Sequence, residues 1–263
     1  MKRLKIMGIL NVTPDSFSDG GRYNSVKDAL ERARSMVHEG VDIIDVGGYS
    51  TRPAGYTEIT EEEEISRVIP VIEAISDLGP DISIDTFRGP VARRALEAGA
   101  TMINDQWRGT YDETILDAAR DFDAPIFLMH NNDHASYGDV VEDMIRELLE
   151  SAELAKSHGV KEENIWLDPG IGFVKSRKEE LEVMRRLDEL VAVGYPVLLA
   201  TSRKRMIKEL MDEEAPAHGR DEATAATTIH GIHKGVAGVR VHNIALNRKL
   251  SDAYVRLKED LDG

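Results

Sequence analysis

The 263-residue chain contains no cysteine and no long uninterrupted apolar run. Without cysteine it can form no disulfide, bind no metal through a thiolate and use no cysteine nucleophile. No stretch approaches the roughly 20 apolar residues that a membrane-spanning helix needs. Residues 1–11 already have the pattern of a strand and lack the apolar core of a signal peptide. We therefore expect a cytoplasmic protein.

Basic residues are in the minority, since 33 Lys and Arg face 48 Asp and Glu and give a formal net charge of −15. An acidic surface of this kind argues against nucleic acid and anionic membranes as partners. The run Glu61–Glu64 is most simply interpreted as a solvated helix face. The charge therefore narrows the class of partner to small molecules or proteins and leaves the active site undefined.

Hydrophobic residues make up 41% of the chain, which is enough for one large core. Short runs rich in Ile, Val and Leu alternate with charged stretches of helical spacing, and no Pro/Gly/Ser-rich linker divides them. The expected strands are Lys5–Asn11, Val41–Gly47, Asp81–Asp85, Thr101–Asn104, Pro125–His130, Asn164–Asp168, Pro196–Ala200 and Gly238–His242. The expected helices include Ser25–His38, Glu61–Ser76, Gly138–His158 and Arg177–Val193. This repeated alternation predicts an α/β protein with a single-domain (β/α)8 TIM barrel over residues 1–263, with a doubly wound open sheet as the alternative.

Two polar segments directly follow the first two expected strands. Val12–Asn24 and Tyr49–Thr60 are long and rich in Gly, Pro, Ser and Thr. In a parallel barrel, the segment after a strand lies at the C-terminal rim. We therefore expect these two segments to act as lids over a site.

Each expected strand ends in, or leads to, polar or charged residues. In chain order these are Asn11, Ser50-Thr51-Arg52, Asp85, Asn104-Asp105, Met129-His130, Asp168, Ser202-Arg203-Lys204, and Arg240 with His242. A single Asp after a strand is often only a helix N-cap. Capping does not explain eight strand ends, so the pattern predicts a site at the C-terminal face of the barrel.

The strand-end residues fall into two chemical kinds. A carboxylate accepts two parallel N–H bonds, an Asn adds a donor and an acceptor, and a Lys donates to a ring carbonyl, which suits a flat heterocycle with amide and amidine edges. This first kind comprises Asp85, Asn104, Asp168 and Lys204. The second kind offers donors for a phosphate-type anion and comprises Asn11, Thr51, Arg52, Arg240 and His242. Together they predict a site for a heterocycle attached to a diphosphate.

Two details refine this prediction. Arg240 and His242 are two residues apart on one expected strand and so share a face. Because the rim contributes less to the core than the middle of the barrel, we expect replacement of Arg240 to spare the fold.

Gly170-Ile171-Gly172 resembles part of a phosphate loop, but a tight turn between strand and helix is the simpler interpretation.

The motif Asn-Val-Thr-Pro-Asp-Ser-Phe-Ser-Asp-Gly-Gly at residues 11–21 resembles the first signature of the dihydropteroate synthases. Ser50-Thr-Arg-Pro53 resembles the second-loop motif of that family. The remaining matches follow in family order: Ser83-Ile-Asp85-Thr86, Asn104-Asp105, Leu167-Asp168-Pro-Gly-Ile-Gly-Phe173, Ser202-Arg203-Lys204 and Arg240-Val-His242. The resemblance covers nearly the whole chain, and the segments 104–107 and 240–243 are most similar to the staphylococcal-type enzymes.

The resemblance implies a transferase of folate biosynthesis. It would join 6-hydroxymethyl-7,8-dihydropterin diphosphate to 4-aminobenzoate with release of pyrophosphate, and it would be a homodimer and a sulfonamide target. The implied pterin contacts are Asp85, Asn104, Met129, Asp168 and Lys204, and the implied diphosphate contacts are Asn11, Arg52, Arg240 and His242. Mg2+ would be held by Asn11 and the diphosphate, and Asp19 would order its surroundings. The implied 4-aminobenzoate pocket is Phe17, Thr51, Pro53, Phe173 and Ser202.

Within this set, the resemblance assigns catalysis to Asp85, Lys204, Arg240 and His242. The chain departs from the family pattern in three places: Tyr49 stands where many members have Glu, Asn243 stands where many have Asp, and Ala54 is inserted after Pro53. No nucleophile–base–acid triad is visible, which fits a dissociative displacement of the diphosphate. The alternatives are a pterin-binding methyltransferase domain with a corrinoid partner, which has no use for the anion set, and a catalytically silent pterin-binding protein.

Overall fold

The computed structural model describes residues 3–12, 21–49, 58–133, 136–211 and 216–261. The strands of this part are β1 (Lys5–Asn11), β2 (Ile43–Gly47), β3 (Asp81–Asp85), β4 (Met102–Asp105), β5 (Ile126–Met129), β6 (Ile165–Asp168), β7 (Leu198–Leu199) and β8 (Gly238–Val241). All of the pairings are parallel, and the order β6-β5-β4-β3-β2-β1-β8-β7 follows the chain around a ring. The predicted doubly wound alternative is therefore wrong, because such a sheet reverses its strand order.

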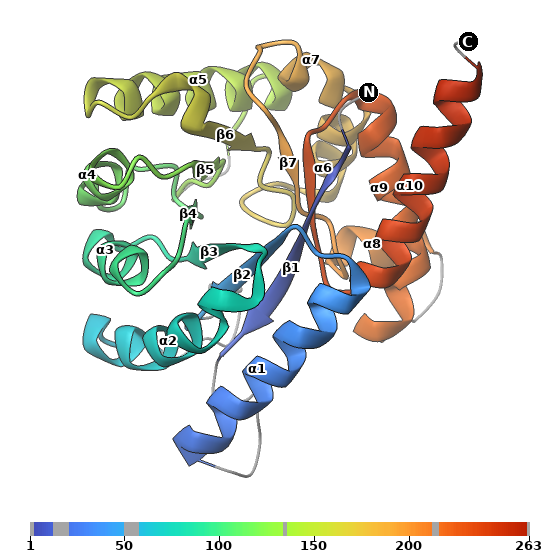
Figure 1. Cartoon of the computed structure of the whole chain (residues 1–263). Coiled ribbons are helices and arrows are strands. Elements are labelled where there is room, and N and C mark those ends of the chain that lie inside the picture. The colour runs from blue at the N-terminus through green and yellow to red at the C-terminus, as the bar shows by residue number, and fades with distance from the viewer. Residues whose placement is uncertain (1–2, 13–20, 50–57, 134–135, 212–215, 262–263) are drawn as a thin grey trace.

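The ring closes between β6 and β7 through a thin connection. There the structure has one isolated bridge, which pairs Leu167 with Val197. The Leu167 amide also donates to the Pro196 carbonyl at 3.0 Å. The predicted TIM barrel is thus confirmed as eight described strands in a nearly closed barrel, with helices around it (Figure 1).

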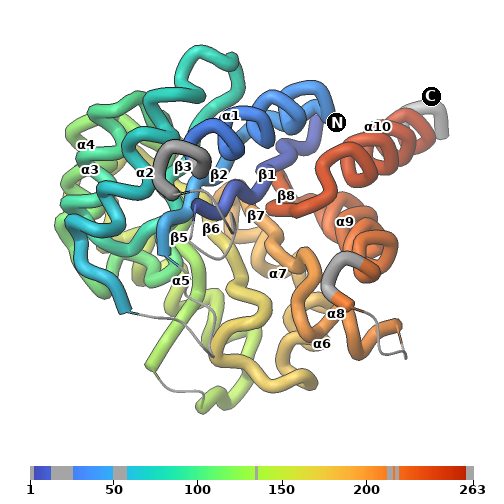
Figure 2. Tube along the Cα trace, turned by 90° about the horizontal axis from the view of Figure 1, so that it is seen from below, coloured from blue at the N-terminus to red at the C-terminus, as the bar shows by residue number. Residues whose placement is uncertain are grey.

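The helices follow the strands in alternation and form the outer layer. They are α1 (Gly21–Glu39), α2 (Glu61–Ile75), α3 (Gly89–Glu97), α4 (Thr114–Asp121), α5 (Val140–Ser157), α6 (Arg177–Arg185), α7 (Leu187–Val191), α8 (Arg205–Leu210), α9 (Asp221–Lys234) and α10 (Ile244–Leu261). The last helix, α10, lies beside β1 and α1, so the two ends of the chain share one side of the barrel (Figure 2). None of these described helices is both long enough and apolar enough to cross a membrane.

Local sequence signals explain where several helices begin. Asp139 caps α5 by accepting from the amides of Val141 at 2.9 Å and Glu142 at 3.0 Å. Ser176 and Glu179 form a capping box at the start of α6.

The expected single helix Arg177–Val193 is wrong, because the chain turns at Arg186 and makes α6 and α7. At this turn Arg186 has φ −103° and ψ 23°. Its guanidinium reaches Asp139 at 2.7 Å, while Leu187 and Leu190 of α7 are fully buried. The tertiary packing of α7 thus overrides a helical periodicity that continues through the turn.

The alternation of side chains inside the barrel determines which residues face the site. The apolar layer of the barrel consists of Met7, Ile43, Phe127 and Leu198, with Met102 and Trp166 packed against it. Since side chains on a strand alternate, the residue two positions further along also faces inward, closer to the C-terminal end. On β2, β4, β5 and β6 these next residues are Asp45, Asn104, Met129 and Asp168. This upper layer, at the C-terminal end of the barrel, is therefore polar on β2, β4 and β6, and it lies above the apolar layer.

Candidate active site

Arg240 of β8 binds two carboxylates, which come from β2 and β3. Its Nε donates to Asp45 Oδ2 and its Nη2 donates to Asp85 Oδ2, each at 2.6 Å. Asn104 Nδ2 also donates to Asp45 Oδ2 at 3.1 Å, and Gln106 Nε2 donates to Asp85 Oδ1 at 2.5 Å. The structure thus brings together three predicted site residues, Asp85, Asn104 and Arg240. Residues of β2, β3, β4 and β8, together with Gln106 just beyond β4, form one connected cluster.

Burial governs the charges of this cluster. It raises the pKa of Asp85 to about 7, against the opposing effect of the Arg240 charge. Asp45 is fully buried, and its Oδ1 has no hydrogen-bond partner within the described residues. A buried carboxylate oxygen without a partner is costly and indicates a place where a ligand can donate.

Asp45 was missed in the sequence analysis because it stands inside the apolar run Ile43–Gly47 and not at its end. The alternation was the available signal, since Ile43 faces the barrel interior and Asp45 must then do so as well.

Asp168 and Lys204 form the second half of the site. Asp168 Oδ1 accepts from the Gly170 amide at 2.7 Å. Lys204 Nζ donates to the Ile171 carbonyl and lies 4.9 Å from the ring centre of Phe173. Burial raises the pKa of Asp168 against the charge of Lys204, and burial lowers the pKa of Lys204 to about 8. The predicted residues Phe173 and Lys204 are therefore neighbours, and the charges of Asp168 and Lys204 act on each other.

The segment Gly170-Ile171-Gly172 has the geometry of a tight turn, as the simpler interpretation predicts. Gly170 has φ 66°, and a Cβ placed there would lie 2.0 Å from the His130 carbonyl oxygen. Only glycine fits such a left-handed position against a backbone atom. The Gly172 amide donates to Glu180 Oε1 at 2.8 Å, so α6 holds the far side of the turn.

Ser202, which was predicted for the 4-aminobenzoate pocket, and His242, which was predicted for the diphosphate, are joined to each other. Ser202 Oγ lies 2.9 Å from His242 Nδ1 and accepts from the His242 amide at 3.1 Å. Arg203 is turned away from this pair and binds both carboxylate oxygens of Asp221, at 2.7 and 2.9 Å. Asn243, which stands where many members of the family have Asp, donates from its Nδ2 to the same carboxylate at 3.0 Å.

Asn11 ends β1 beside Gly47, its register partner on β2. A Cβ placed on Gly47 would lie 3.5 Å from both Asn11 Oδ1 and Asp85 Oδ2. The missing side chain thus leaves a small cradle that is faced by oxygen atoms from two strands.

Met129 and His130 close the fifth strand. Met129 is buried and pairs in register with Asp168. His130 is fully buried, with Nδ1 2.8 Å from Lys175 Nζ and Nε2 3.1 Å from Glu147 Oε2. Lys175 and Glu147 were not among the predicted site residues.

The predicted residues Phe17, Asp19, Thr51, Arg52 and Pro53, and the inserted Ala54, lie outside the described residues. The described residue Tyr49 makes an edge-on contact with Phe87, at 5.7 Å between ring centres. The Arg88 guanidinium lies 5.2 Å from the Tyr49 ring centre and pairs with buried Glu64 at 2.8 Å. Tyr49, which stands where many members of the family have Glu, therefore packs against an aromatic ring and a guanidinium group.

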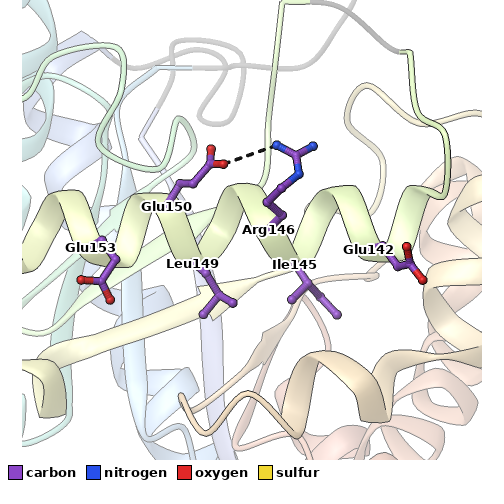
Figure 3. A pocket seen from close by; sticks show the side chains of 6 residues that line it. All are labelled: Glu142, Ile145, Arg146, Leu149, Glu150 and Glu153. Atoms are coloured by element: carbon purple, nitrogen blue, oxygen red, sulfur yellow. Dashed lines mark hydrogen bonds and ion pairs between the residues drawn. The ribbon is translucent and has the colours of Figure 1, made fainter.

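A surface hollow with a volume of about 700 Å3 lies elsewhere, on the outer side of α5. It is lined by Glu142, Ile145, Arg146, Leu149, Glu150 and Glu153 (Figure 3). The charged groups here pair with one another at the surface, as Arg146 does with Glu150 at 3.4 Å. The buried charged groups that come from different strands meet at the strand ends instead, so we place the chemistry there.

Comparison with known proteins agrees with this geometry. The family model described as pterin binding enzyme matches residues 7–242. A curated dihydropteroate synthase of Staphylococcus haemolyticus is 60% identical over 260 residues, which cover 99% of this chain and 97% of that protein. A crystal structure of dihydropteroate synthase from Clostridium difficile, determined in the presence of pteroic acid, superposes with a TM-score of 0.93 at 45% identity and covers 97% of each chain. The enzyme of Xanthomonas albilineans with 4-aminobenzoic acid has a TM-score of 0.92 at 38% identity, over 98% of this chain and 94% of that one.

Proposed function

The chain belongs to the dihydropteroate synthases of the pterin-binding enzyme family, and we propose that its strand-end residues carry the family reaction. It joins 6-hydroxymethyl-7,8-dihydropterin diphosphate to 4-aminobenzoate, with pyrophosphate as the leaving group. The observation that supports the assignment of residues is the polar upper layer of the barrel, where Arg240 bridges Asp45 and Asp85. The methyltransferase alternative has no support among the relatives described above.

The hydrogen-bond acceptors and donors of the upper layer of the barrel bind the pterin. Asp168 and Asp85 accept from ring N–H and amino groups, and Asn104 offers one donor and one acceptor. Lys204, held over the Phe173 ring, donates to the ring carbonyl. Asp45 joins this set, because its unpartnered Oδ1 is a further acceptor in the same layer.

The displacement proceeds by departure of the diphosphate followed by attack of the arylamine on the exocyclic carbon. The two buried carboxylates Asp85 and Asp168 offset the positive charge that develops on the pterin ring. Arg240 uses two of its five N–H donors on Asp45 and Asp85, so three remain for the departing anion. His242, just beyond β8, completes the anion side, and its hydrogen bond with Ser202 connects that side to the 4-aminobenzoate pocket.

A magnesium ion fits the residues at Asn11. The carboxamide oxygen of Asn11 faces the cradle at Gly47, and hard oxygen ligands suit Mg2+. The described residues contain no cluster of three or more acidic or histidine side chains that could hold a metal on its own, so the diphosphate would supply the other ligands. When bound, the ion neutralises charge on the diphosphate.

The same resemblance supports a homodimeric enzyme in the cytoplasm. Sedimentation of the purified protein tests the dimer, and a monomer at micromolar concentration would refute it.

A turnover assay tests the proposed function. The protein is incubated with the pterin diphosphate, 4-aminobenzoate and Mg2+, and 7,8-dihydropteroate and pyrophosphate are measured together. We expect equimolar products, and we expect chelation of the metal to stop them. Tight pterin binding without product would instead identify the silent pterin-binding protein.

A further inference from the structure

A second buried lysine lies next to the pterin side of the site. Lys175 follows the Gly170–Gly172 turn and is only 9% exposed. Its Nζ lies 2.8 Å from His130 Nδ1 and donates to the Gly170 carbonyl at 3.4 Å. A buried ammonium is costly, so its hydrogen-bond partners must compensate it.

The protonation of this group follows from its partners. Burial and the charges of Lys175 and Arg108 lower the pKa of His130 to about 2, so the ring is neutral. Its Nδ1 therefore accepts from Lys175, and its Nε2 donates to Glu147 Oε2 at 3.1 Å. Asn132 Nδ2 donates to the same oxygen at 2.7 Å. The chain Lys175–His130–Glu147 thus ties α5 to the turn after β6.

Gly170 joins this chain to Asp168. The Gly170 amide donates to Asp168 Oδ1 at 2.7 Å, and the Gly170 carbonyl accepts from Lys175. The His130 amide also donates to the Asp168 carbonyl at 2.9 Å. Both ends of Asp168, its side chain and its backbone, are therefore held by residues that Lys175 contacts.

We propose that Lys175 is a positioning residue for pterin binding, which orients Asp168 through Gly170 and helps to keep that carboxylate ionised. The inference rests on the proposed function, because it takes Asp168 to be the acceptor for the pterin. It makes Lys175 distinct from Lys204, which lies over Phe173 and faces the substrate directly.

The charges around Asp168 give the proposal a pH signature. Asp168, Lys175 and His130, which follows β5, face charged and titratable groups from several neighbouring elements. These are Tyr137 before α5, Glu147 from α5, Glu180 from α6, Lys204 before α8, Arg240 from β8 and Arg108 after β4. Burial raises the pKa of Asp168, while Lys204, Arg240 and Lys175 lower it. Burial also lowers the pKa of Lys175 to about 7, so Lys175 carries its charge below that pH and can there act on Asp168. Removal of the Lys175 charge should therefore raise the pKa of Asp168.

The experiment is calorimetric titration of the whole enzyme with 6-hydroxymethylpterin between pH 5 and 8.5. Lys175→Gln keeps a donor without the charge, Lys175→Met removes both, and Lys175→Arg keeps the charge. Because the ligand's own titration is common to all proteins, the affinities are compared as ratios to the wild type at each pH. We expect the acid midpoint of binding to move up by about 0.5–1 pH unit in the Gln and Met variants and to return toward the wild-type value in the Arg variant. The Met variant should also bind about tenfold more weakly at pH 8, since it leaves Gly170 without its donor.

Arg248→Met is the matched control. Arg248 is a cation of similar burial, but it pairs with Asp42 and the Leu4 carbonyl at the opposite end of the barrel. This variant should melt earlier and keep the wild-type acid midpoint. If the Lys175 variants also melt earlier but keep the wild-type midpoint and affinity, Lys175 is only structural and the proposal is overturned. If Asp168→Asn keeps wild-type affinity, the assignment of Asp168 in the proposed function fails instead.

Discussion

Arg240 on β8 donates a 2.6 Å hydrogen bond to Asp85 on β3, across the polar upper layer of the barrel. The same guanidinium binds Asp45 at 2.6 Å, so two buried carboxylates share one cation. The position at the rim suggests that Arg240 can be replaced without harm to the fold. These two ion pairs change that expectation, because the groups of the site also stabilise the barrel around it.

Arg240→Met should lower both stability and catalytic rate. Removal of one partner from a buried ion pair costs about 3–5 kcal/mol. Loss of a preorganised donor to the departing anion costs a further ~2–4 kcal/mol in transition-state stabilisation. Steady-state kinetics below the melting temperature of the variant separate the two effects. A normal kcat in the folded protein would make Arg240 purely structural.

Asp168→Asn should leave the fold intact and weaken pterin binding by about 1–3 kcal/mol, because the amide NH2 would face a donor of the ligand. The Asn oxygen can still accept from the Gly170 amide, which preserves the turn. Calorimetry with the pterin measures the loss. Asp42→Asn, at the opposite end of the barrel, is the control and should bind normally.

Asp85 should make stability and pterin affinity depend on pH in opposite directions. Its folded pKa of about 7 lies above the unfolded value of ~3.9. The native state therefore holds an extra proton between these values, and this group's contribution to stability grows as pH falls below 7 and is lost as pH rises through 7. Pterin affinity should instead fall toward acid pH, since the acceptor must be ionised. Denaturant unfolding of the wild type and of Asp85→Asn between pH 5 and 8 tests this. In the variant, the free energy of unfolding should lose the part of its pH dependence that comes from Asp85.

Gly170→Ala should be far more harmful than Gly194→Ala. Both glycines have positive φ, at 66° and 99°, so both substitutions incur roughly 1–2 kcal/mol of backbone strain. Only at Gly170 does the new Cβ meet the His130 carbonyl oxygen, whereas at Gly194 no atom lies within 4 Å. Urea unfolding should show the larger loss at Gly170, accompanied by weakened pterin binding. Equal losses at the two positions, with normal pterin binding, would show that the turn does not control Asp168.

The sequence alone predicts the barrel and much of the site, because both depend on local patterns. The alternation of apolar runs locates all eight described strands, and the strand-end rule finds Asp85, Asn104, Asp168 and Lys204. The limits are equally physical. The strand-end rule does not find Asp45, because this residue lies inside an apolar run and is assigned to the strand. The roles of Lys175 and Glu147 depend on contacts between elements that are far apart in the chain, and no local periodicity encodes them.

The thin closure between β6 and β7 has a mechanical consequence. A closed sheet of eight strands deforms first where its strand pairing is weakest. Here that place is the closure between β6 and β7, which has one bridge beside a strand of two residues. Asp168 ends β6 on one side, and Lys204 follows β7 on the other. Any widening of the ring at this closure therefore moves the carboxylate away from the ammonium, while the cluster on β2, β3, β4 and β8 stays fixed by continuous ladders. The candidate site is therefore joined by continuous strand pairing on the β8–β4 side and by a single bridge on the side between Asp168 and Lys204.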